Sequence, residues 1–339
     1  MDDTHISLAH GNGGHYMREL IERLFARHLG NPLLDVRSDA ARLPGLDGRH
    51  LDGELMVTTD GFTVQPLEFP GGTIGSLAVH GTVNDLAVSG AVPHYLTLSA
   101  FIEEGFEIAQ LERIVISLAR AARDANVAVV AGDTKVLRRG EGGGLYLSAT
   151  GIGTRPRGLQ IGIDRIRPGD AVLVSGPVGD HGIAVMLARE QFGLHGELTS
   201  DAASVLPLTQ ALLPLAGLRF MRDPTRGGLA TVLHEICRAG NLQVRLRQPA
   251  VPVREQVGAV CEMLGYDPMY LACEGRVVAV VEPSQAGEAL ARWQALPQGS
   301  AAAIIGSINA GRAQVVLETE LGGERLLEEL QDDPLPRIC

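Results

Sequence analysis

Apolar positions along this chain alternate between helical spacing and short strand-like runs. Met17–Leu29 and Ile108–Ala125 carry apolar residues at the three- and four-residue intervals of an amphipathic helix, and Ile74–Ser89 is predicted to be a helix of small residues. Apolar runs between these helices predict the strands Leu55–Thr59, Tyr95–Ile102, Val127–Ala131 and Leu145–Gly153. Residues 1–153 are therefore expected to form one domain of mixed α+β structure.

A change of composition follows this first domain. Residues 154–169, TRPRGLQIGIDRIRPG, are rich in Arg, Pro and Gly, which is typical of a linker between domains. The alternation then resumes over residues 170–330. Its predicted helices are Ile183–Phe192, Ala202–Leu215, Gly228–Ala239, Arg254–Leu264 and Ser284–Leu296. Its predicted strands are Ala171–Val174, Leu242–Leu246, Arg276–Val281 and a hairpin of Gln314–Glu318 with Glu324–Leu327.

The last nine residues, QDDPLPRIC, read differently from both domains. Pro334 and Pro336 oppose a helix and a central strand, so residues 331–339 are predicted to be an extended, exposed tail. The pattern as a whole predicts two α+β domains in series, followed by this tail.

Composition narrows the class of protein. Of 339 residues, 45% are hydrophobic and 20% are charged, as in a globular protein. The net charge of −11, without a basic tract, argues against nucleic acid as a partner. The N-terminus resembles no signal peptide, and no apolar run is long enough to span a membrane, so we expect a cytoplasmic protein that does not bind membranes.

The four cysteines form no CxxC pair, which argues against a zinc site or a redox motif. Cys237, Cys261 and Cys273 lie in apolar stretches and are expected to be buried and inert. Cys339 is the final residue of the proline-containing tail. Its thiol is either a nucleophile on a mobile arm or an incidental terminal residue.

Five aspartates lie beside glycines or at the predicted ends of strands: Asp39, Asp60, Asp85, Asp133 and Asp223. Mg²⁺ prefers oxygen ligands, commonly one or two carboxylates together with phosphate and water. Each aspartate alone could instead cap a helix or a turn. As a set, they predict a magnesium–nucleotide site.

Two glycine-rich segments precede predicted helices: His10-Gly11-Asn12-Gly13-Gly14 and Pro70-Gly71-Gly72. Backbone N–H groups at the start of a helix can bind phosphate. Neither segment matches GxGxxG or GxxxxGK[ST], so each is either a phosphate-binding loop or an ordinary turn.

Three further residues could take part in chemistry. Lys135 follows a predicted buried strand and could hold a phosphate, supply a proton or form a surface salt bridge. Glu274, in ACEGR, could be a general base or a solvated charge. His181, in GDHG, could bind phosphate or pack in a turn.

Taken together, these motifs resemble the hydrogenase maturation factor HypE family, which belongs to the aminoimidazole-ribonucleotide synthetase (PurM-like) superfamily. The motifs that carry the resemblance, in order, are HGNGG, TTDGF, FPGGTIG, NDLAVSGA, GDTKV, SGPVGDHG, DPTRGGL, CEGR and PLPRIC. They run from His10 to Cys339 and so cover nearly the whole chain.

The resemblance implies a two-domain PurM-like fold. Its N-terminal domain would bind ATP and form a β-barrel in a homodimer, and its C-terminal domain would be an α/β layer. Proteins of this family receive a carbamoyl group on the terminal cysteine from the carbamoyltransferase HypF. They dehydrate it with ATP to a thiocyanate, and the cyanide passes to iron on a HypC–HypD complex during assembly of the [NiFe]-hydrogenase centre.

The resemblance also assigns roles to residues. Cys339 matches the carrier, and Lys135 and Glu274 match a catalytic pair. Positions for ATP are implied at His10, Gly11, Gly13, Gly14, Asn84, Thr134, His181 and Arg226. Positions for Mg²⁺ are implied at Asp39, Asp60, Asp85, Asp133 and Asp223, of which Asp39 matches less well because the stretch Leu43–Gly53 departs from the usual spacing.

Two alternatives remain open from the sequence. Another enzyme of the superfamily, such as a selenophosphate synthetase or a thiamine-monophosphate kinase, would share the fold. A selenophosphate synthetase usually carries a reactive residue near its N-terminus, whereas the first cysteine here is Cys237. A scaffold that only docks maturation partners would have no need of the carboxylates.

Overall fold

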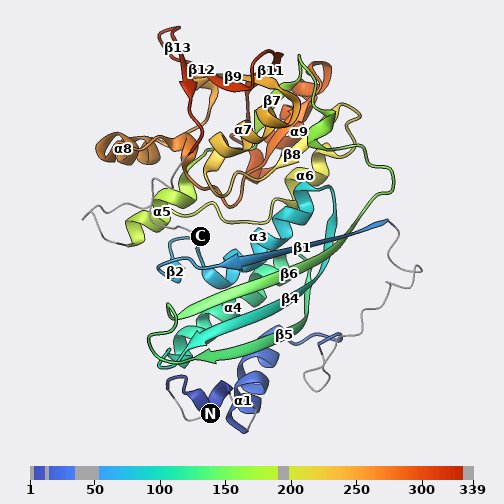
Figure 1. Cartoon of the computed structure of the whole chain (residues 1–339). Helices are drawn as coiled ribbons and strands as arrows, with labels where there is room; N and C mark the ends of the chain where they lie inside the picture. Colours follow the sequence, from blue (N-terminus) through green and yellow to red (C-terminus); the bar gives the residue numbers. More distant parts are fainter. Residues whose placement is uncertain (1–3, 12–14, 35–52, 190–197, 331–339) are drawn as a thin grey trace.

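The computed structural model describes residues 4–11, 15–34, 53–189 and 198–330 (Figure 1). Two layered units follow one another, each built on its own β-sheet. The sequence prediction of mixed α+β structure is confirmed, and the predicted tail lies outside the described residues.

The first unit contains a four-stranded sheet in the order β1-β6-β4-β5. Its strands are β1 (Glu54–Phe62), β4 (Val92–Glu103), β5 (Ala128–Leu137) and β6 (Leu145–Arg155). β4 and β5 are parallel, and the other neighbours are antiparallel. A small ribbon of β2 (Glu68–Phe69) and β3 (Gly72–Thr73) leads into the first long helix.

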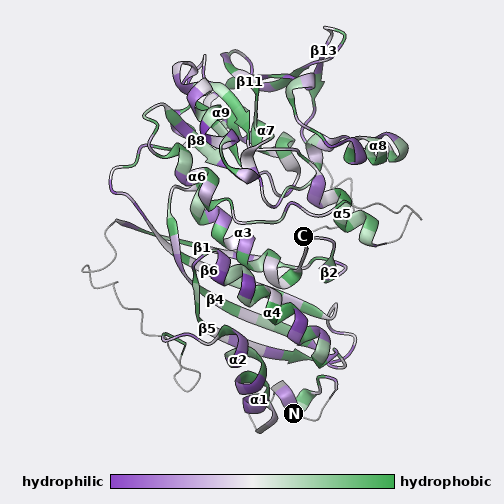
Figure 2. Ribbon diagram, turned by 180° about the vertical axis from the view of Figure 1, so that it is seen from behind, coloured by the Kyte–Doolittle hydropathy of each residue, from purple (hydrophilic) through white to green (hydrophobic). Residues whose placement is uncertain are grey.

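Among the described residues, helices cover one face of this sheet and leave the other face without a helix (Figures 1 and 2). α3 (Ile74–Val88) begins at Thr73, whose side chain accepts hydrogen bonds from the first turn in a capping box with Ser76. α4 (Ile108–Asp124) turns its apolar side to the core. The helical run α1 (His15–Leu20), η2 (Ile21–Ala26) and α2 (Arg27–Leu29) packs beside β5.

The second unit contains a seven-stranded sheet in the order β13-β12-β9-β11-β7-β10-β8. Its strands are β7 (Ala171–Val174), β8 (Leu218–Arg222), β9 (Leu242–Arg247), β10 (Val278–Val281), β11 (Ala303–Ala310), β12 (Gln314–Glu318) and β13 (Glu324–Leu327). Every residue of β7 and β10 is buried, because these strands are covered on both faces.

Two apolar cores sandwich that sheet. α7 (Gly228–Gly240) packs on one face, and α6 (Leu206–Leu212) and α9 (Ala286–Gln294) pack on the other. α5 (Asp180–Ala188) and α8 (Glu255–Leu264) instead share the core of the N-terminal unit. The two units are therefore joined by continuous apolar packing.

Short helical turns complete the described elements: η1 (Leu8–Gly11), η3 (Ile163–Arg165), η4 (Gln248–Ala250), η5 (Pro268–Tyr270), η6 (Pro283–Gln285) and η7 (Pro297–Gly299). No helix among the described residues combines the length and the apolar character needed to cross a membrane.

Several predictions of element boundaries were wrong. β1 continues past Asp60, and β5 continues past Asp133, so neither aspartate ends its strand. The predicted helix Ala202–Leu215 begins only at Leu206, because residues 198–205 form neither helix nor strand. β2, β3, β8 and β11 were not predicted; the last two pair only with strands that are distant in the sequence.

The four-stranded sheet is open in a single chain. β1 and β5 form its two edges, and no closed barrel exists within the described residues. The helix-free face carries exposed Leu55 and Val57 on β1 and Phe101 on β4. Leu55 and Val57 lie close together on the edge strand, and Phe101 lies farther along the same face of the sheet. Exposed apolar residues on such a face are typical of a surface that another chain covers.

The contact between α3 and α4 predicts a sharp contrast between two glycines. A Cβ on Gly75 would collide with the backbone carbonyl oxygen of Ile114, whereas a Cβ on Gly258 in α8 would meet no atom within 4 Å. Gly75→Ala should therefore cost about 1–3 kcal/mol and lower the melting temperature. Gly258→Ala should gain about 0.5–1 kcal/mol. Thermal denaturation followed by circular dichroism compares the two, and equal melting temperatures would contradict this packing.

Candidate active site

Four carboxylates from both units line one small cavity. Asp60 lies in β1, Asp85 in α3, Asp223 directly after β8 and Glu274 shortly before β10. Arg226 completes the wall with Thr225. The tertiary fold thus brings together five of the residues predicted from sequence, although more than 200 positions separate the first from the last.

Burial and mutual repulsion shift the pKa of these acids. Burial, and then the neighbouring Asp85, raises the pKa of Asp223 to about 7. Burial, and then Asp223, raises the pKa of Glu274 well above its ordinary value. Burial also raises the pKa of Asp85, although the Thr58 hydroxyl donates a 2.7 Å hydrogen bond that opposes the shift. A cation in this cavity would relieve the repulsion.

The cavity suits magnesium only in company with a phosphate. Among the described residues, no three His, Cys, Asp or Glu side chains are grouped closely enough to hold a metal ion by themselves. Mg²⁺ commonly takes one or two carboxylates and completes its shell with phosphate and water oxygens. The donor set of Asp60, Asp85 and Asp223 fits that kind of site.

Asp133 and Lys135 lie away from this cavity within the same chain. Lys135 Nζ is 3.4 Å from Asp133 Oδ2, and both side chains are largely exposed on β5. Because Thr134 between them is buried beneath the helices, Asp133 and Lys135 point to the helix-free face. Asp60 is on the opposite edge strand, three strand spacings or roughly 14 Å away.

The first glycine-rich segment begins beside β5. His10 is buried in η1, where its Nδ1 accepts a 3.1 Å hydrogen bond from the Ser7 N–H and its ring packs against Tyr16. The backbone of Gly11 closes η1. Gly13, Gly14, Asp39 and Cys339 lie outside the described residues.

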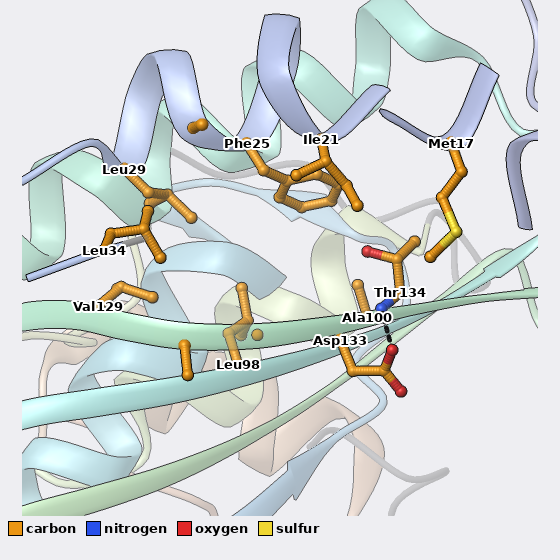
Figure 3. Close-up of a pocket in the computed structure, with 13 residues that line it drawn as sticks. Met17, Ile21, Phe25, Leu29, Leu34, Leu98, Ala100, Val129, Asp133 and Thr134 are labelled. Carbon is orange, nitrogen blue, oxygen red and sulfur yellow. Dashed lines mark hydrogen bonds between the residues drawn. The ribbon is translucent and has the colours of Figure 1, made fainter. Parts of the chain in front are cut away.

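An apolar pocket of about 220 Å³ lies between this helical run and β5 (Figure 3). Ile21, Phe25 and Leu29 form one wall, and Leu98 and Val129 form the other. Asp133 and Thr134 lie at one end, so the pocket opens next to the predicted phosphate and metal residues. Its apolar walls, with polar residues at one end, suit a flat aromatic base attached to a charged group.

Asn84 and His181 occupy the seam between the units instead of lining the acidic cavity. The Asn84 amide bonds to residues of the C-terminal unit, and His181 Nδ1 lies 2.8 Å from Ser200 Oγ with its ring edge-on to Phe69. Pro70-Gly71-Gly72 also belongs to this seam, since the Pro70 carbonyl accepts a hydrogen bond from the Ser200 N–H. The predicted ATP contacts at Asn84 and His181 stay predictions.

A buried ionic group that the sequence does not predict lies next to Glu274. Arg276 lies 3.4 Å from both Asp180 and Asp201, and Arg254 donates a 2.7 Å hydrogen bond to Asp180. Asp201 Oδ1 accepts a hydrogen bond from the Glu274 N–H. Asp180 and Arg276 lie within the motifs GDHG and CEGR, but the sequence around Asp201 contains no motif that indicates a functional role.

The three described cysteines are buried, as predicted. Burial raises the pKa of the Cys261 thiol to about 12 and that of Cys273 well above its ordinary value. The Cys273 thiol also accepts a hydrogen bond from the Gly179 N–H. These thiols are poor nucleophiles at neutral pH.

Comparison with known proteins fits this architecture. Residues 38–155 match the N-terminal domain, and residues 167–318 the C-terminal domain, of AIR synthase related proteins. A thiamine-monophosphate kinase from Stenotrophomonas maltophilia, 24% identical, has the same fold with a TM-score of 0.65. The class of the protein is therefore the two-domain AIR synthase related, or PurM-like, group.

Similarity within that class is much closer to one family. Carbamoyl dehydratase HypE of Azotobacter vinelandii is 46% identical over 98% of this chain and 97% of its own length. HypE of Escherichia coli is 42% identical over 99% of this chain and its whole length. A crystal structure of HypE in complex with ATP superposes with a TM-score of 0.92 at 44% identity, covering 98% of this chain and 99% of that one. The chain belongs to the HypE carbamoyl dehydratase family.

The raised pKa of Asp223 predicts a pH-dependent effect on stability. Ionisation of the buried Asp223 carboxyl lowers the stability of the folded protein. This loss begins as the pH rises above the ordinary pKa of 3.8 and reaches its full size above about pH 7. Asp223→Asn removes that loss. Without divalent cations, it should raise the melting temperature more at about pH 8 than at about pH 5.

Differential scanning fluorimetry in EDTA measures this difference, with the exposed Asp164→Asn as control. A gain that is equal at both pH values would mean that ionisation of Asp223 is not its cause.

Proposed function

We propose that this chain dehydrates a carbamoyl group carried on the thiol of its own Cys339, at the expense of ATP, and yields a thiocyanate for cyanide delivery to a [NiFe]-hydrogenase centre. The observation that carries the proposal is the acidic cavity built from both units, in a chain of the HypE family. Such a cavity suits phosphoryl transfer, in which positioning and charge neutralisation provide most of the catalysis.

The reaction balances as follows. The carbamoyl oxygen attacks the γ-phosphorus of ATP, so an O–P bond forms, ADP leaves, and the amide nitrogen gives up one proton. A base then removes the second N–H proton as the C≡N bond forms and the C–O bond breaks, releasing phosphate. The oxygen therefore departs as phosphate, a far better leaving group than hydroxide.

Each residue of the proposed set has one task. Cys339 carries the carbamoyl group. Glu274, only 4% exposed in the cavity wall, accepts an N–H proton, and Lys135 orients the phosphoryl group or transfers the other proton. Asp60, Asp85 and Asp223 would hold Mg²⁺, which would neutralise phosphate charge when bound.

The tail has the reach for this task. Leu330, the last described residue, lines a groove that also contains Asp85 and Asp223. Residues 331–339 can span about 30 Å at roughly 3.3 Å per residue. The thiol can thus enter the cavity from that groove or extend to a second protein.

A homodimer would supply what one chain lacks. Lys135 lies on the opposite edge and opposite face of the sheet from Asp60, so the proposed pair of Lys135 and Glu274 does not meet within one chain. If two open sheets close into one barrel, the exposed face with Leu55, Val57 and Phe101 becomes covered. Asp133 and Lys135 of one protomer would then serve the acidic cavity of its partner.

ATP would span the two regions. The pocket in Figure 3 suits the base, and Thr134 at its polar end would contact the phosphates near Asp133. The residues His10, Gly11, Gly13 and Gly14 of the glycine-rich segment are proposed to bind the phosphates as well. Arg226 lines the acidic cavity and could bind a phosphate from the other side.

Two partners follow from the chemistry. A crystal structure of a HypE–HypF complex, 42% identical to this chain with a TM-score of 0.79, supports HypF as the carbamoyl donor. A HypC–HypD complex carrying iron would accept the cyanide. We place the reaction in the cytoplasm, with neither nucleic acid nor membrane as a partner.

The shared site predicts complementation between inactive variants. Lys135→Met and Glu274→Gln homodimers should each lose at least about 100-fold in dehydration rate. A mixed dimer contains one site with both native residues, so its total rate per dimer should be about half that of the native dimer. Mass spectrometry of Cys339, following loss of water from the carbamoylated form, measures it. Mixed dimers as inactive as both parents would place the whole site within one chain.

The carrier role predicts the effect of Cys339→Ala. This variant should keep its melting temperature and its ATP binding, because the Cys339 thiol is proposed to carry the substrate and to take no part in binding ATP. It should accept no carbamoyl group from HypF. Cys237→Ala, at a buried thiol, is the control and should be carbamoylated normally. A carbamoyl group found on Cys261 or Cys273 would refute the assignment.

A further inference from the structure

Glu274 is held by its backbone from two directions. Its N–H donates a 3.1 Å hydrogen bond to Asp201 Oδ1, and its carbonyl oxygen accepts a 3.0 Å hydrogen bond from Asn84 Nδ2. Asp201 belongs to the segment 198–205, and Asn84 belongs to α3 of the N-terminal unit. The peptide groups on both sides of the Glu274 Cα are therefore fixed.

Both N–H groups and the carbonyl oxygen of the Asn84 amide form hydrogen bonds in this arrangement. Its second N–H donates to the Ala203 carbonyl at 3.0 Å, and its Oδ1 accepts from the Val205 N–H at 2.8 Å. Asn84 is 1% exposed, so water does not compete for these bonds. One side chain consequently ties α3 to both the segment 198–205 and Glu274.

The other carboxylate oxygen of Asp201 forms an ion pair without a hydrogen bond. Asp201 Oδ2 lies 3.4 Å from Arg276 Nε, whose N–H donates a 2.9 Å hydrogen bond to the Pro177 carbonyl. A Cβ on Gly275 would collide with the Asp201 carbonyl oxygen. A residue other than glycine at position 275 would therefore push the segments that contain Glu274 and Asp201 apart. Position 275 thus permits the close approach that the Glu274–Asp201 hydrogen bond requires.

We infer that Asp201 and Asn84 are positioning residues that aim the Glu274 carboxylate into the cavity. Asn84 directly precedes Asp85, whose carboxylate lines the same cavity. One turn of α3 therefore sets the positions of Asp85 and Glu274 relative to each other, across the seam between the units. This role rests on the proposed function, in which Glu274 accepts a proton from the substrate.

The test distinguishes a misplaced Glu274 carboxylate from an unfolded protein and from weakened ATP binding. Asp201→Ala removes the acceptor for the Glu274 N–H and should lower kcat for dehydration about 10- to 100-fold, since a misplacement near 1 Å has effects of that size. The KM for ATP should change less than about twofold, because Asp201 lies behind Glu274 and not along the cavity wall. Carbamoylation of Cys339 by HypF should be unaffected.

Conservative replacement provides the decisive comparison. Asp201→Asn keeps an Oδ1 acceptor at the same place, while Arg276 retains Asp180 as its partner, so kcat should return to within about threefold of the native value. Ser204→Ala is the matched control: it removes a hydrogen bond to the Leu206 N–H from the same segment and should leave kcat unchanged. If Asp201→Ala does not fold, Asn84→Ser tests the other anchor and should show the same loss of kcat.

The outcomes distinguish this inference from the proposed function. Glu274→Gln with native kcat would refute the proposed role of Glu274. If Glu274→Gln is inactive but Asp201→Ala or Asn84→Ser has the native kcat, the positioning role is overturned and the proposed role of Glu274 stands. If kcat falls equally in Asp201→Ala and Asp201→Asn, the effect comes from the lost charge. That result would also overturn the positioning role.

Discussion

The primary amide of Asn84 joins the two units at the point where the acidic cavity forms. Its three hydrogen bonds reach Ala203, Val205 and Glu274, all in the C-terminal half of the chain. Because the amide is buried, each unmade bond would cost the full desolvation of a polar group. The relative placement of the two sheets is therefore coupled to the placement of a proposed catalytic residue.

This coupling explains how an unfavourable site can persist. Four carboxylates share one small cavity, and burial with mutual repulsion raises the pKa of Asp223 and Glu274. Without packing that holds them in place, these carboxylates would move apart or the cavity would admit more water. The continuous apolar cores and the Asn84 hydrogen bonds hold it closed, so the repulsion remains available to attract a magnesium–phosphate group.

The open sheet imposes the second constraint. β1 and β5 are separated by two strands, and alternation along each strand turns Asp60 and Lys135 to opposite faces. No rotation of side chains can bring Lys135 to Glu274 across that distance. The proposed homodimer would satisfy this geometry and would at the same time cover the exposed apolar residues of β1 and β4.

The sequence by itself determined the class of fold, most helices, the terminal hairpin and the residues of the acidic cavity. Periodicity is a local property, and glycine-bounded motifs carry their own chemistry, so both can be read without coordinates. Only the tertiary structure showed that β1 and β5 extend through Asp60 and Asp133, that residues 202–205 are not helical, and that Asn84 joins the two units. It alone revealed Asp201, because its partners Glu274 and Arg276 lie more than 70 positions away and no local pattern encodes such a contact.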